Sequence, residues 1–206
     1  MRNSVAGLST DSALYQLVNL SAYATYCTTF YFNSTVKHQY QAIHGEDAKI
    51  MIESSDVAFA LHASLMSSIL CYQIVSYGGF KITPPSKFTK YILSLVFLWS
   101  LAIIALIITK IYFLWIDFLY FLASIKVFLG IGSYLSQVLL NYHRRSTMGF
   151  NIWTIILDFT GGTLSLFQLI FDSIDMHDVR GGIFGNWAKL VVSLISLAFD
   201  VSRDLS

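Results

Sequence analysis

The chain has 206 residues, of which 55% are hydrophobic and 12% are charged, and its formal net charge is +1. Soluble domains carry about 25% charged residues, so this composition indicates a membrane protein. A near-neutral charge provides no basic face and argues against nucleic-acid binding. Cys27 and Cys71 fall inside apolar stretches without a ligand cluster nearby, so we interpret both as buried thiols.

The apolar stretches predict how often the chain crosses the membrane. A bilayer-spanning helix needs roughly 20 mostly apolar residues. Stretches that meet this requirement lie at residues 12–32, 56–75, 91–112, 118–142, 150–171 and 182–201. Short polar connections separate them, and glycine and proline pairs mark a turn within residues 76–90. The sequence therefore predicts an all-α membrane protein with six transmembrane helices.

Basic residues predict the orientation of these helices, because cytosolic loops are enriched in lysine and arginine. The basic residues that fall on one side are Arg2, Lys81, Lys87, Lys90, Arg144, Arg145 and Arg203. On the other side, the basic residues are diluted by acidic ones. We therefore expect the first side and both termini to be cytosolic. The sequon that begins at Asn33 then lies on the lumenal side, which makes Asn33 a candidate glycosylation site.

An internal repeat links the two halves of the chain. Residues 2–9 and residues 144–151 share the pattern R-x-S-x-x-G-x-[SN], and each copy opens a predicted membrane helix from the cytosolic side. Parallel repeats of this kind are typical of transporters. A complete predicted helix precedes the second copy and none precedes the first. We expect from this asymmetry that one helix is missing from the front of the chain.

Four of the predicted helices carry polar residues at three- and four-residue steps, which places each set on one helix face. The four sets are Ser12, Gln16 and Asn19; Lys126, Gly130, Ser133, Gln137 and Asn141; Asn151, Thr154, Asp158, Gly161, Ser165 and Gln168; and Lys189, Ser193, Ser196 and Asp200. The helix predicted at residues 91–112 has no comparable stripe before its end. The pattern predicts a polar cavity lined by four helices, with one apolar spacer.

Asp158 is the most unusual residue of these stripes, because a carboxylate at membrane depth costs a few kcal/mol. Lys126 lies about 12–14 Å into its helix and Asp158 about 12 Å into its own at ~1.5 Å per residue, so we expect them to meet near the midplane. Gln16 follows Gly7 by the same spacing as Asp158 follows Gly149. An acid, a base and amides suit a zwitterionic solute. A structural ion pair between Asp158 and Lys126 is the alternative.

Other polar residues have simpler interpretations. Asp56 and Asp117 stand at lumenal helix starts, where a solvated cap is the default. Ser193 and Ser196 are typical of helix packing, and His62 is typical of a hydrogen-bonded bundle histidine. No nucleophile–base pair or metal cluster is recognisable, so the sequence predicts neither enzymatic activity nor a cofactor.

A set of motifs recurs along the chain, at segments 134–137 with Asn141, 145–149 and 157–162, supported by segments 55–63, 125–126 and 199–201. Together these motifs resemble the cystinosin family of PQ-loop transporters. The resemblance implies a seven-helix fold, with two three-helix bundles around a linker helix, of which this chain supplies helices two to seven. Residues 1–75 are then an incomplete first bundle, residues 76–112 a loop and linker helix, and residues 113–206 the second bundle.

The resemblance also implies roles for single residues. Asp158 matches the proton-coupling aspartate. The residues expected to line the substrate site are Lys126, Gln16, Asn19, Tyr134, Thr154 and Asn141, and those expected in gating or proton linkage are Asp56, Lys189, Asp200 and Gln137. The implied function is proton-coupled export of L-cystine from the lysosome, in the lysosomal membrane with a cytosolic C-terminus. L-cystine, protons and membrane lipid are thus the implied partners.

This sequence departs from the family pattern at several positions. Ser136 replaces the proline of the loop, Gln16 and Thr154 replace asparagines, and Ser133 replaces a lysine. Two substrate carboxylates would then face one mid-membrane lysine, Lys126. The alternatives are therefore a transporter of another small solute, such as a cationic amino acid or a sugar, or a non-transporting membrane receptor or fragment.

Overall fold

The computed structural model describes residues 7–46, 50, 52–78, 81, 83–109, 114–145 and a few positions between 160 and 171. The chain forms two compact units, Met1–Ser146 and Thr147–Ser206. The helices predicted at residues 150–171 and 182–201 fall in the second unit, almost wholly outside the described residues, so they stay predictions. The architecture below is that of the first unit.

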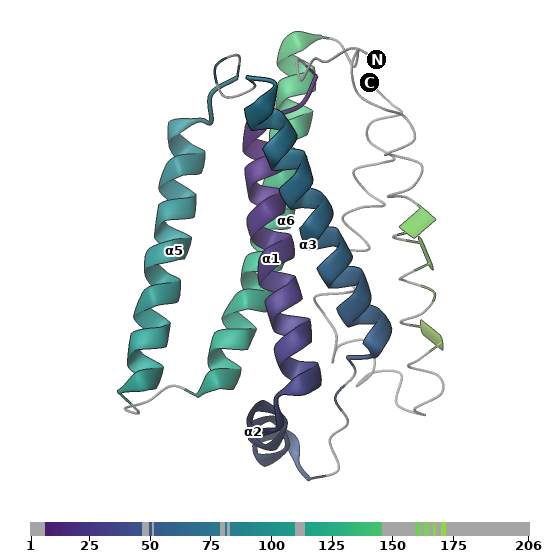
Figure 1. Cartoon of the computed structure of the whole chain (residues 1–206), viewed down its shortest axis with the longest axis vertical. Helices are drawn as coiled ribbons and strands as arrows, with labels where there is room; N and C mark the ends of the chain where they lie inside the picture. Colours follow the sequence, from purple (N-terminus) through teal and green to yellow (C-terminus); the bar gives the residue numbers. More distant parts are fainter. Residues whose placement is uncertain are drawn as a thin grey trace. The chain divides into compact units, whose positions relative to one another are not determined.

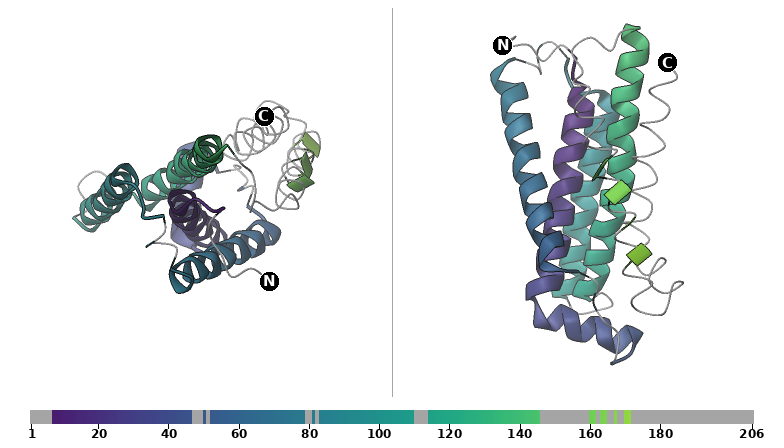
Figure 2. Two further views of the ribbon diagram at one scale, coloured as in Figure 1. Left: turned by 90° about the horizontal axis from the view of Figure 1, so that it is seen from above. Right: turned by 90° about the vertical axis from the view of Figure 1, so that its right-hand side faces the viewer.

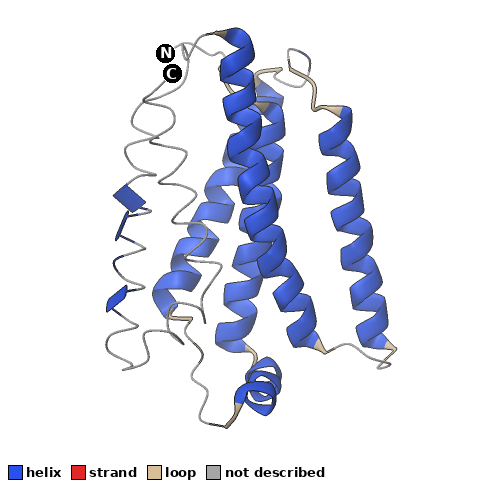
Figure 3. Ribbon diagram, turned by 180° about the vertical axis from the view of Figure 1, so that it is seen from behind, coloured by secondary structure: helices blue, strands red, loops and turns tan. Residues whose placement is uncertain are grey.

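The described part of the first unit is helical and contains no strand (Figure 3). Its helices are α1 (Thr10–Phe32), α2 (Ser34–His44), α3 (Ser54–Ser76), α5 (Lys87–Ile108) and α6 (Trp115–Arg144). Four of them coincide with predicted membrane spans to within a few residues. By length and composition, α3, α5 and α6 are apolar enough to cross a membrane. The prediction of an all-α membrane protein is confirmed at this level.

Helix α2 was not predicted. Its 11 residues are too few and too polar to form a membrane span, and the sequence offers no long apolar run there. The Asn33 side chain caps it by accepting a hydrogen bond from the Val36 backbone N–H at 3.2 Å. It ends at Gly45, whose φ of 104° is accessible mainly to glycine. Helix α2 lies across the end of α1 (Figure 2).

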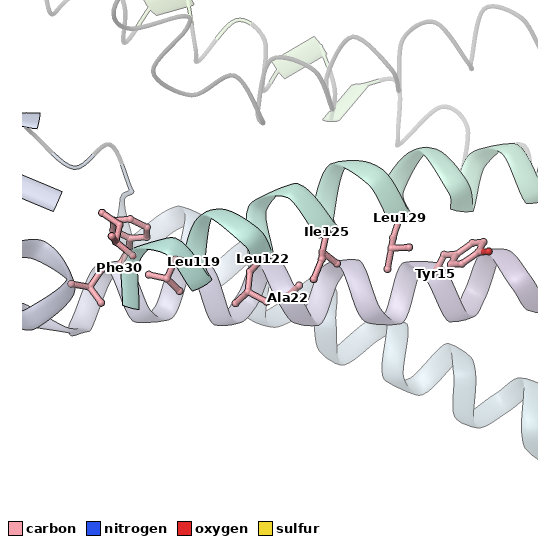
Figure 4. Close-up of a cluster of buried hydrophobic side chains, with 9 residues drawn as sticks. Tyr15, Ala22, Phe30, Leu119, Leu122, Ile125 and Leu129 are labelled. Carbon is pink, nitrogen blue, oxygen red and sulfur yellow. The ribbon is translucent and has the colours of Figure 1, made fainter. Parts of the chain in front are cut away.

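Helix α1 is the centre of the first unit, because α6 and α3 both pack along it (Figures 1 and 2). The main core lies between α1 and α6 (Figure 4). Its largest buried side chains include Tyr15, Phe30, Ile116, Leu119 and Leu129, which are at most 3% exposed. Shape-matched packing of this kind holds membrane helices together, because lipid tails compete equally for apolar surface.

Helix α5 is the least buried of the three described helices that are apolar enough to cross a membrane. Only Thr89 and Ile107 are buried on it, whereas Phe97 and Trp99 are more than 60% exposed. A helix that is apolar on all sides and unburied by protein is typical of a lipid-facing span. This agrees with the apolar spacer predicted at residues 91–112.

Two carboxylates cap the first turns of helices, as the sequence predicted. An Asp56 oxygen accepts a hydrogen bond from the Glu53 N–H at 3.0 Å, at the start of α3. An Asp117 oxygen accepts one from the Leu114 N–H at 2.8 Å, at the start of α6. Negative charge is stabilised at helix N-termini, where backbone N–H groups lack helical partners. The capping interpretation of both residues is confirmed.

Candidate functional site

The polar stripes of α1 and α6 meet along the contact between these two helices. Ser12 and Asn19 on α1 are buried, and so are Ser133 and Gln137 on α6. The predicted spacing therefore placed these four residues correctly on buried faces. Gln16 differs, because its side chain is exposed rather than enclosed in the contact.

The Gln137 side chain makes three hydrogen bonds. Its Oε1 accepts a hydrogen bond from the Ser9 backbone N–H at 2.9 Å. Its Nε2 donates to the Gly7 carbonyl oxygen and to Asn141 Oδ1, each at 3.1 Å. Gly7 and Ser9 belong to the first copy of the internal repeat, and Gln137 lies just before the second copy. One side chain thus connects the first copy of the repeat to α6, the helix that precedes the second copy.

Ser12 and Ser133 form a second polar contact one to two turns further in. Their hydroxyl oxygens are 2.9 Å apart, and the Ser133 hydroxyl also donates to the Ser12 carbonyl oxygen at 3.0 Å. Both side chains are at most 8% exposed. Buried hydroxyls require such partners because an unpaired polar group away from water is costly. We define Gly7, Ser9, Ser12, Ser133 and Gln137 as the polar end of the α1–α6 contact.

Lys126 lies deeper along α6 and is half-buried. Its Nζ is 3.0 Å from the centroid of the Tyr23 ring of α1, well inside the range of a cation–π contact. Sequence reasoning missed Tyr23. The helical spacing could have identified it, because Tyr23 follows Asn19 by four residues and so lies on the same face as Ser12, Gln16 and Asn19. A pattern of polar residues does not include tyrosine, because its ring is largely apolar.

The start of α5 is fixed to the start of α1 by contacts that the sequence did not predict. The Ser86 N–H donates to Asp11 Oδ1 at 2.8 Å, and the Thr89 hydroxyl donates to the Tyr15 hydroxyl at 3.0 Å. These bonds join residues 74 and 75 positions apart. They attach one end of the lipid-facing helix to α1.

The remaining predicted site residues are distributed as follows. Tyr134 and Asn141 lie half-buried on α6, and Asp56 caps α3. Asn33 is exposed and caps α2. Residues predicted for the site that lie outside the described part of the chain are Thr154, Asp158, Lys189 and Asp200. The predicted approach of Asp158 to Lys126 therefore stays a prediction.

Comparison with known proteins assigns this arrangement to a family. The PQ loop repeat family model matches residues 118–177, which include Lys126 and Gln137. The chain is 33% identical to a cystinosin homolog of Arabidopsis thaliana over 97% of this chain and 73% of that protein. The chain belongs to the cystinosin family. It is therefore a multi-pass membrane protein of a family of transporters.

Further relatives show the same relationship over different shares of their length. A cystinosin homolog of Dictyostelium discoideum is 31% identical over 97% of this chain and 69% of that protein. Cystinosin of Bos taurus is 30% identical over 97% of this chain but only 53% of that protein. The chain thus spans about half the length of the bovine relative.

Proposed function

We propose that this chain transports L-cystine together with protons across the lysosomal membrane, from the lumen to the cytosol, by alternating access. Membership of the cystinosin family supports the transporter class. The observation that carries the mechanism is the position of Gln137, whose side chain bonds to Gly7, Ser9 and Asn141. A single amide that connects the first copy of the repeat to α6 is suited to gate the space between α1 and α6.

The proposed architecture is the seven-helix arrangement of two three-helix bundles and a linker, of which this chain contributes six membrane helices. Residues 1–75 belong to the first bundle, residues 76–112 contain the linker helix and residues 113–206 form the second bundle. The exposure of α5, with only Thr89 and Ile107 buried, supports its role as the linker. Both termini are cytosolic in this proposal, and the polar end of the α1–α6 contact faces the cytosol.

In the proposed site, Lys126 pairs with a carboxylate of the substrate, since ionised partners form the strongest hydrogen bonds. Residues that supply further hydrogen bonds are Gln16, Asn19, Tyr134, Thr154 and Asn141. Asp158 accepts a proton from the acidic lumen and releases it to the cytosol. Asp56, Lys189 and Asp200 take part in proton linkage or gating.

A gating step follows from the polar end. For a solute to leave toward the cytosol, the bonds of Gln137 and the Ser12–Ser133 pair have to open. Water can replace each of these hydrogen bonds, so their net contribution is only about 0.5–1.5 kcal/mol apiece. Such contacts can break and reform in every transport cycle.

A second candidate is transport of a solute with a single carboxylate, such as a cationic amino acid, or of a sugar. Ser133 favours this candidate. Its hydroxyl is neutral, buried and bonded to Ser12, so this position adds no positive charge to that of Lys126. A competition panel separates the candidates, because L-cystine competes only at a site that binds its carboxylates. A receptor or fragment would bind a solute without carrying it.

The test is Asp158→Asn in the full chain, reconstituted into liposomes with an imposed pH gradient. We expect proton-driven L-cystine current to fall to background, because the amide cannot carry the proton. Asp117→Asn is the matched control, since asparagine also caps helices and the residue lies at a helix start. Its current should stay close to that of the unsubstituted chain. A normal current in Asp158→Asn would contradict the assignment.

A further inference from the structure

The contact between Tyr23 and Lys126 gives the proposed transport site a residue that the sequence motifs did not include. The Lys126 Nζ is 3.0 Å from the ring centroid of Tyr23, so the ammonium lies against the face of the ring. The face of an aromatic ring carries negative partial charge and attracts cations within about 6 Å. The two residues come from α1 and α6, the helices that also form the polar end.

The ring of Tyr23 is held in place by neighbouring rings. Tyr26 stacks on it with centroids 6.3 Å apart and an interplanar angle of 15°. Tyr26 in turn packs edge-on against Phe30, with ring centroids 4.9 Å apart. Phe30 packs edge-on against Tyr40 of α2, with ring centroids 5.9 Å apart. Phe30 is 2% exposed and is part of the main core. The Tyr23 ring is therefore the last member of an aromatic row that begins in the main core.

A ring face suits a lysine that has to receive an anion. An ammonium taken out of water needs compensation, and a ring face supplies it without using the N–H donors.

We propose that Tyr23 is the positioning residue of Lys126, and that its ring face, rather than its hydroxyl, holds the ammonium where a substrate carboxylate can reach it. This inference rests on the proposed function, in which Lys126 binds the carboxylate. It assigns to Tyr23 a role in substrate affinity and not in the rate of the transport cycle.

Transport kinetics test the role of the ring face. Tyr23→Phe keeps the face and should leave KM for L-cystine within about twofold, whereas Tyr23→Leu should raise KM about tenfold with a nearly unchanged maximal rate. Tyr26→Leu is the matched control, because it removes the next ring of the row, and its KM should stay within about threefold. Equal KM increases in both leucine variants, or a tenfold increase in Tyr23→Phe, would overturn the proposal.

A second measurement is independent of transport. Reductive methylation of the purified full chain with ¹³C-formaldehyde gives dimethyl-lysine NMR signals, and the signal missing from Lys126→Arg belongs to Lys126. The ring current of Tyr23 should move this signal upfield of the other lysine signals. We expect the displacement to persist in Tyr23→Phe and to disappear in Tyr23→Leu.

The two measurements distinguish failure of this inference from failure of the proposed function. A Lys126 signal at the ordinary lysine position, or one that does not respond to Tyr23→Leu, overturns the positioning role whatever the transport result. A displaced signal that responds to Tyr23→Leu, in a chain that carries no solute, supports the contact and overturns the proposed function.

Discussion

The two ends of the α1–α6 contact are held together by different kinds of interaction. At the polar end, Gln137 and the Ser12–Ser133 pair connect the helices by hydrogen bonds. At the opposite end, which we call the apolar end, Phe30, Ile116 and Leu119 are at most 2% exposed and pack with Val36 of α2. Figure 4 shows Phe30 and Leu119 together at that end.

This difference indicates which end can open. Water replaces hydrogen bonds at a net free energy of about 0.5–1.5 kcal/mol each. Separating close-packed rings and branched side chains leaves voids, and truncating a single one costs several kcal/mol. We infer that α1 and α6 separate at the polar end and pivot about the apolar end. Three substitutions test this comparison, in order of decreasing expected effect.

The largest effect is expected at the apolar end. Phe30→Ala should lower the free energy of unfolding by about 3–5 kcal/mol, because it leaves a cavity among buried side chains. Phe32→Ala is the matched control, since Phe32 is 70% exposed and should cost no more than about 0.5 kcal/mol. Denaturant titration of both variants in detergent measures the difference. Equal losses would show that the apolar end is not a rigid pivot.

An intermediate effect is expected at the polar end. Gln137→Leu removes the two hydrogen bonds that α6 makes to Gly7 and Ser9 and should shift the helix pair toward the open state by about 1–3 kcal/mol. In a chain without Cys27 and Cys71, a Ser12→Cys thiol should then react with a water-soluble maleimide about 5–150 times faster. Gln73→Leu on α3, where the glutamine is exposed, should leave the rate unchanged. An unchanged rate in Gln137→Leu would argue against opening at this end.

The smallest effect is expected at the contact between α2 and α6. Gln39 Oε1 accepts a hydrogen bond from the Ile116 N–H at 3.2 Å, in the first turn of α6. Gln39→Ala should cost about 1 kcal/mol and speed amide hydrogen exchange in that turn about fivefold. Gln41→Ala, two residues along α2, serves as the control with little change. Exchange that is equally slow in both variants would mean that this bond does not stabilise the apolar end.

The membrane helices could be predicted because runs of about 20 apolar residues have few other stable arrangements. Helix α2 could not, since an 11-residue helix of mixed polarity is marginal alone and depends on its docking. Its fully buried Val36 and the Gln39–Ile116 bond are tertiary contacts that no local pattern reveals.

The candidate site was predictable to a similar extent. Three- and four-residue spacing correctly put Ser12, Asn19, Ser133 and Gln137 on buried faces, although it also grouped the exposed Gln16 with them. Partners across the helices were not predictable. Gln137 bonds to Ser9 at a separation of 128 residues, and this pairing depends on the register between α1 and α6, which helical periodicity does not contain.

The most direct test of the central claim is to lock the polar end. The hydroxyls of Ser12 and Ser133 are 2.9 Å apart, so Ser12→Cys with Ser133→Cys, in a chain without Cys27 and Cys71, should form a disulfide on oxidation. Proton-coupled current is measured in liposomes after the oxidant is removed, and again after reduction and removal of the reductant. We predict that the current disappears when the pair is oxidised and returns when it is reduced. An oxidised, fully cross-linked chain that carries an undiminished current would contradict the account.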